Sequence, residues 1–191
     1  MLERLSACSL SPRDAPAERS HAPRRGSRLV HLQFMQMRSK FVEKGKSIHY
    51  YSVNWDPAVL AWKDFRGAVL GPTDPASAPV GALRRTLYDT WEALGLAAAP
   101  NTGDNGVHAS ASPFEGFAER TNWLKTTCTT DVFGKDLVAA GIPEAVLKEW
   151  SVDPQVDVGD GKKASLFDQL EDLDLGACKE KLVELYKLKS A

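Results

Sequence analysis

The chain is poor in cysteine, which argues against a disulfide-rich protein and against a protein built around a structural metal. Its three cysteines (Cys8, Cys128 and Cys178) are widely spaced and form no C-x-x-C pair, which argues against a disulfide scaffold and fits a reducing compartment. The four histidines show no metal-ligand spacing with these cysteines. We therefore expect no structural metal site.

Long apolar runs and excess charge are also missing. No run approaches the roughly 18 apolar residues that a membrane span needs, so we expect no membrane partner. The formal net charge is −1, from 24 basic and 25 acidic residues. This balance lacks the basic footprint of nucleic-acid binding proteins, although it would hide a local group of arginines around a small anion.

What is present is typical of a globular protein: 191 residues, 43% hydrophobic and 26% charged. Residues 1–28 differ, because they are rich in proline, serine and arginine and have few apolar residues after Leu10. We predict that they form a disordered tail. Their composition is also typical of an organelle transit peptide, but the acidic residues among them argue against this. We expect a cytoplasmic protein.

Hydrophobic periodicity and turn residues predict the elements of the middle of the chain. We expect a proline- and glycine-rich loop over 71–83, which is long enough to be functional or to serve assembly. Gly95 is the expected stop of the helix that follows it. The other expected elements are strands near 29–34 and 47–54, a short helix after the first strand, a helix from Asp56 to 64–67, a helix over 81–96 and a loop over 97–106.

The strongest local signal lies at residues 112–115. Ser112 and Glu115 form a capping box, with Pro113 at the first helical position. We predict a helix from there to about Leu124. Further short helices, joined by acidic linkers, are expected over 139–150 and 166–188, the second with an apolar stripe of Cys178, Leu182 and Leu185.

The residues around His108 contain the parts of a phosphate-transfer site. A histidine nucleophile needs a free ring nitrogen and a carboxylate that fixes its tautomer, and arginines suit the transferring phosphate. His108 precedes the capped helix, Glu119 lies within that helix, and Arg66 and Arg84 flank the 71–83 loop. Taken singly, each of these residues is more often a surface charge or a core residue, so spacing alone leaves the catalytic interpretation a minority one.

Three segments and one residue, in the right order, resemble the nucleoside diphosphate kinase family. RGAVLG (66–71) resembles its R-x-x-L-G strand, and GPTDPASAPVGALR (71–84) resembles its segment G-A-T-N-P…P-G-T-I-R. NGVHASAS (105–112) resembles the active-site stretch N-x-x-H-G-S-D-S, and Glu119 falls at the position of the family's histidine-orienting glutamate. The following AGIP…EW…DPQV is similar to a longer variant of the family.

This resemblance implies a fold and an activity. The fold would be a ferredoxin-like α/β (α+β) arrangement, with an antiparallel sheet and helices. A partial kinase-like domain would span 29–125, and a helical C-terminal extension would span 126–191. The activity would be transfer of the terminal phosphate from a nucleoside triphosphate, such as ATP, to a nucleoside diphosphate.

The resemblance also implies a role for each matching residue. His108 would carry the phosphate, Glu119 would orient it and Ser110 would hold the glutamate. Arg66, Thr73 and Arg84 would contact phosphates, and Asn105 would contact the sugar. Mg²⁺ would bridge the nucleotide phosphates without a protein cage, and the 71–84 loop would pack between subunits of a hexamer or tetramer.

Several departures from the family leave two alternatives open. The family's K-P-D strand, with its phosphate-binding lysine, and its base-stacking aromatic residue have no match, and Ala109 and Ala111 replace a glycine and an aspartate. Either the N-terminal part of the domain is missing from this chain, or the chain is a catalytically weak member that serves as a nucleotide-binding or assembly module.

Overall fold

The computed structural model describes residues 3–5, 44, 47 and 49–190, and the fold in this part of the chain is a mixture of helices and short antiparallel strands, of the α+β class. The expected strand near 29–34 and the helix after it lie outside the described residues. Strand β1 (Glu3–Leu5), from within the tail predicted to be disordered, pairs antiparallel with β2 (Val53–Trp55).

The predicted strand over 47–54 and the predicted helix start at Asp56 are largely wrong. Residues 49–52 are exposed and are not strand, so only β2 remains. Asp56 accepts a hydrogen bond from the backbone N–H of Ala58 and closes a turn. Helix α2 (Trp62–Asp64) begins later and continues as a π-helical segment, η1 (Phe65–Leu70). Its first N–H, on Trp62, donates to Oδ1 of Asp174 at 2.7 Å, so a residue far along the chain caps it.

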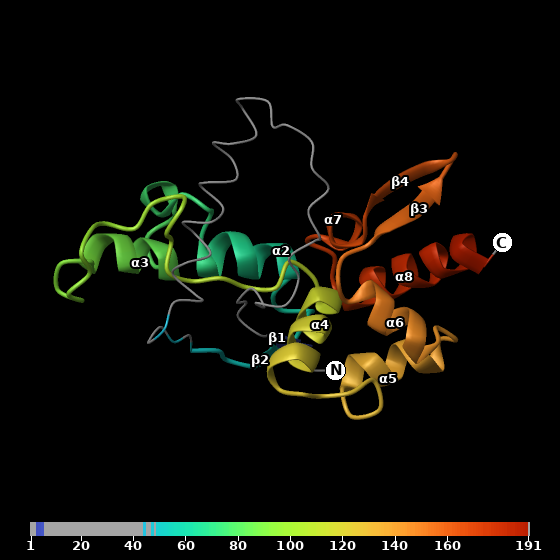
Figure 1. The fold of residues 1–191 in the computed structure, drawn as a ribbon. Coiled ribbons are helices and arrows are strands. Elements are labelled where there is room, and N and C mark those ends of the chain that lie inside the picture. The colour runs from blue at the N-terminus through green and yellow to red at the C-terminus, as the bar shows by residue number, and fades with distance from the viewer. Residues whose placement is uncertain (1–2, 6–43, 45–46, 48, 191) are drawn as a thin grey trace.

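An arm follows, at one end of the molecule in Figure 1. As predicted, 71–82 is loop apart from a short 3-10 turn, η2 (Pro75–Ser77). The predicted helix over 81–96 is shorter than expected, because α3 (Leu83–Thr90) gives way to turns up to Gly95. Gly95 has φ +71°, and the Leu96 N–H donates to the Trp91 carbonyl across it, which is the expected glycine stop. No residue of α3 is buried. Leu83 at its start is exposed, whereas Leu87 is half-buried beside Gly106.

The Ser112 half of the predicted capping box is confirmed, whereas the return bond of Glu115 goes to the residue before the cap. Ser112 accepts from the Glu115 N–H at 3.1 Å and starts α4 (Pro113–Trp123), while the Glu115 carboxylate reaches back to the N–H of Ala111 at 2.6 Å. Residues on either side of the predicted boundary at 125 share one hydrophobic core, because Phe114 and Phe117 of α4 pack with side chains from 133 to 185. The predicted stripe of Cys178, Leu182 and Leu185 is buried in this core.

The C-terminal region differs from the predicted succession of helices. A hairpin of β3 (Gln155–Gly159) and β4 (Lys162–Ser165) stands out beside helix α8 in Figure 1. The predicted helix over 166–188 is broken by a turn at 171–174. The helices of this region are α5 (Val132–Ala139), α6 (Glu144–Trp150), α7 (Leu166–Leu170) and α8 (Leu175–Ser190). In the described part of the chain, none has both the length and the apolar character needed to cross a membrane.

Candidate functional site

Four of the residues singled out in the sequence line one cleft. Arg66 comes from η1, Thr73 from the loop after it, Arg84 from the first turn of α3, and His108 from the segment before α4. The cleft has a volume of about 370 Å³. Its other lining residues are Lys63, Gly67, Leu70, Gly71, Pro72, Ala109, Glu171 and Asp172. The fold thus brings together residues that are separated by more than forty positions in the sequence.

Arg84 joins two walls of this cleft. Its Nη1 donates to the Gly71 carbonyl at 2.7 Å, and its Nε and Nη2 donate to the Val107 carbonyl at 3.1 and 2.8 Å. Gly71 has φ +95°, and a Cβ built on it would lie 2.9 Å from Cβ of Ala78. Only glycine fits this turn without strain. Arg84 therefore holds the loop against the His108 segment.

Asn105 lies behind the loop that carries Thr73. Its side chain is buried, 5% exposed, and its Nδ2 donates to the Thr73 carbonyl at 3.2 Å. Its Oδ1 has no hydrogen-bond partner among the described residues. A buried amide oxygen of this kind can accept a hydrogen bond from a ligand hydroxyl.

His108 lines the cleft, and its surroundings favour the neutral form of the imidazole. Partial burial is the main cause that lowers its pKa, the positive charge of Arg84 lowers it further, and Asp104 acts in the opposite direction. Because the neutral ring has a free nitrogen lone pair, it can act as a nucleophile near neutral pH.

Ser110 and Glu119 form a buried polar pair behind His108. The Ser110 hydroxyl donates to Oε2 of Glu119, and the two residues are 0% and 7% exposed. The Ser110 carbonyl accepts from Nε1 of Trp62 at 3.0 Å. The expected contact between Ser110 and Glu119 is therefore present, whereas the orienting role of Glu119 stays a prediction.

Two acidic residues of the cleft were missed from the sequence. Arg66 forms ion pairs with Glu171, at 2.9 Å from Nη2 to Oε1, and with Asp172 through Nη1. Both carboxylates belong to the turn between α7 and α8, which is more than one hundred residues away in the sequence. No local pattern could connect them with Arg66.

Lys63 is a third cation that the sequence analysis did not select. It lines the cleft one helical turn before Arg66, and residues three apart on a helix share a face. Within the described residues it makes no ion pair. The spacing K-x-x-R before the loop was the signal that could have identified it.

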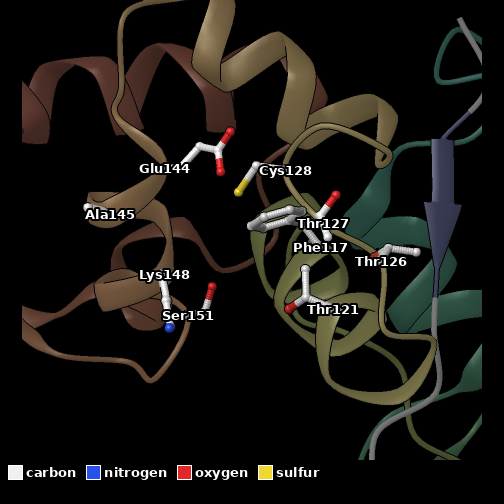
Figure 2. Close-up of a pocket in the computed structure, with 9 residues that line it drawn as sticks. All are labelled: Phe117, Thr121, Thr126, Thr127, Cys128, Glu144, Ala145, Lys148 and Ser151. Carbon is white, nitrogen blue, oxygen red and sulfur yellow. The ribbon is translucent and has the colours of Figure 1, made fainter.

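A second cavity, of about 530 Å³, lies between α4 and α6 (Figure 2). Cys128 and Glu144 point toward one another across it. Burial and the nearby Glu144 carboxylate raise the pKa of the Cys128 thiol, which keeps it protonated and weakly nucleophilic. This cavity therefore offers less chemistry than the cleft around His108.

No group of three or more histidine, cysteine, aspartate or glutamate side chains in the described part of the chain is arranged to hold a metal ion. Comparison with protein-family models, with curated proteins and with solved structures found no match for this chain.

Proposed function

We propose that this chain transfers the terminal phosphate of a nucleoside triphosphate to a nucleoside diphosphate through a phosphorylated His108. The observation that carries the proposal is the meeting of a neutral imidazole with three cationic side chains, Lys63, Arg66 and Arg84, in one cleft. Phosphoryl transfer depends mostly on positioning and on cations around the transferring group. The grouping of these side chains in one cleft supports the proposal on this ground.

The reaction would run in two half-steps. A ring nitrogen of His108 attacks the terminal phosphorus of the bound triphosphate, the N–P bond forms, and the bond to the bridging oxygen breaks. The nucleoside diphosphate leaves with that electron pair. A second diphosphate then attacks the phosphohistidine through a terminal phosphate oxygen, which forms the new triphosphate and restores the neutral imidazole.

The other side chains would have supporting roles in these steps. Lys63, Arg66 and Arg84 would balance the charge on the phosphate oxygens, and Asn105 would accept a hydrogen bond from the sugar. Glu119, supported by Ser110, would orient the ring. Mg²⁺ would enter bound to the nucleotide phosphates. A ferredoxin-like sheet and a hexameric or tetrameric assembly are part of the same proposal.

Radiolabel transfer tests the proposal directly. Incubation with γ-labelled ATP should give an acid-labile label that chases to ADP or GDP and is absent from His108→Ala. His49→Ala is the matched control, because His49 is an exposed histidine far from the cleft in the sequence. Label that persists in His108→Ala, or that is lost equally from both variants, would contradict the assignment.

A second candidate is a nucleotide-binding module with little turnover. The observation that favours it is the engagement of both arginines, since Arg84 donates to two backbone carbonyls and Arg66 pairs with two carboxylates. Loss of a single electrostatic contact to a transition state costs on the order of 10²–10³ in rate. Steady-state transfer and nucleotide affinity measured on the same preparation distinguish the two. Binding with turnover far below about 10 s⁻¹ would favour the module.

A further inference from the structure

The turn between α7 and α8 brings two negative charges into the cleft. Glu171 and Asp172 each face a different terminal nitrogen of the Arg66 guanidinium. The side chain of Arg66 is 28% exposed, and those of the two acids are 51% and 37% exposed. The ion pairs therefore lie at the mouth of the cleft, within reach of a ligand from solvent.

Two hydrogen bonds, one between backbone groups and one to a side-chain carboxylate, fasten this turn to the segments that carry His108 and Lys63. The Asp172 N–H donates to the Ala111 carbonyl at 2.9 Å, which ties the turn to the His108 segment. Two residues further on, Asp174 caps the N-terminus of α2 through the Trp62 N–H. The acidic pair is thus held in place by contacts that do not involve Arg66.

A phosphate would need the same part of Arg66. The guanidinium fork binds carboxylate and phosphate oxygens through the same N–H groups. In this conformation Nη1 and Nη2 each donate to a carboxylate. A phosphate that binds through the same N–H groups must displace one of these carboxylates, and a phosphate on the remaining N–H groups would lie beside them. Two fixed negative charges also repel an incoming anion.

We propose that the carboxylates of Glu171 and Asp172 compete with phosphate for Arg66. This competition lowers the affinity of the cleft for phosphorylated ligands. The inference rests on the phosphate site of the proposed function, but it does not need transfer to occur. Exposed ion pairs contribute about 0.2–1 kcal/mol each. Release of Arg66 from both should therefore tighten anion binding between about two- and thirtyfold.

Calorimetric titration of the full chain with pyrophosphate and with ADP tests this. Glu171→Gln/Asp172→Asn should bind both ligands more tightly than the unaltered chain, by the factor above. The matched control is Asp160→Asn/Glu180→Gln, which removes the same charge from exposed positions outside the cleft. In an Arg66→Ala background the gain should fall to the level of this control.

Equal affinity in the double variant and its control would overturn the proposal, and so would weaker binding, which would show that the acids position Arg66. Absence of pyrophosphate binding by every variant would overturn it as well. If the double variant does not fold, Glu171→Gln alone can be tested. Glu171 is the more exposed partner, and its replacement should give part of the increase in ligand affinity. Tighter pyrophosphate binding without any phosphate transfer would uphold this inference while the proposed function fails.

Discussion

The ion pair between Arg120 and Asp131 connects the helix that carries Glu119 to the C-terminal helices, and its loss should be costly. Nε and Nη2 of Arg120 meet the two carboxylate oxygens of Asp131 at 2.7 and 3.1 Å, and the side chains are 5% and 4% exposed. Removal of one partner from a buried pair costs about 3–5 kcal/mol, because the other charge stays buried. Asp131 also caps α5 through the N–H groups of Phe133 and Gly134, which adds about 1 kcal/mol.

We therefore expect Asp131→Ala to lower the free energy of unfolding by about 4–6 kcal/mol. Asp131→Asn keeps an oxygen for the cap and should cost about 3–5 kcal/mol. A domain of ordinary stability, about 5–15 kcal/mol, barely tolerates the larger loss. The asparagine variant is therefore the one to measure.

Urea unfolding followed by circular dichroism gives the comparison. The control is Asp89→Asn, which breaks a surface pair with Arg85 of similar length, 2.9 Å, whose side chains are 46% and 32% exposed. That variant should lose far less stability than Asp131→Asn, because water screens an exposed ion pair. If Asp131→Asn cost no more than Asp89→Asn, the reasoning from burial would be refuted.

Two further predictions concern the residues around His108. Ser112→Ala should cost about 1 kcal/mol in urea unfolding, because Ser112 caps α4; unchanged stability would contradict the capping role. The pKa of His108 is lowered in the folded state, so between that value and the unfolded value of about 6.5 the unfolded chain binds more protons. Stability should therefore rise with pH in this window and level off above it. His108→Asn should flatten that rise, and identical pH profiles for the two proteins would show that another group causes it.

Local signals in the sequence account for the start of α4 and for part of the cleft. Ser112, Pro113 and Glu115 act on neighbouring backbone groups, so their effect is visible in a short window. The hairpin β3–β4 was missed although its signal was present. Asp160 and Gly161 have φ values of +53° and +69°, which suits the two-residue Asp-Gly turn between alternating strands. The acidic character of this segment led to its interpretation as a linker.

Other features depend on contacts between distant residues and could not be predicted. The start of α2 is set by a carboxylate 112 positions away, so the local signal at Asp56 predicted a start that is too early. Glu171 and Asp172, which form the ion pairs with Arg66, are about as remote in the sequence. Periodicity predicted the helix at α3 but not the exposure of Leu83, because a repeat indicates a face without showing what covers it.

The cap on α2 has a consequence for the order of events during protein synthesis. A ribosome adds about 5–20 residues per second, so the 112 positions between Trp62 and Asp174 correspond to a delay of roughly 6–22 s. During that interval α2 has emerged without its cap, and Arg66 lacks both of its acidic partners. In a nascent chain, the positive charge of Arg66 is therefore not neutralised until the turn between α7 and α8 has been synthesised.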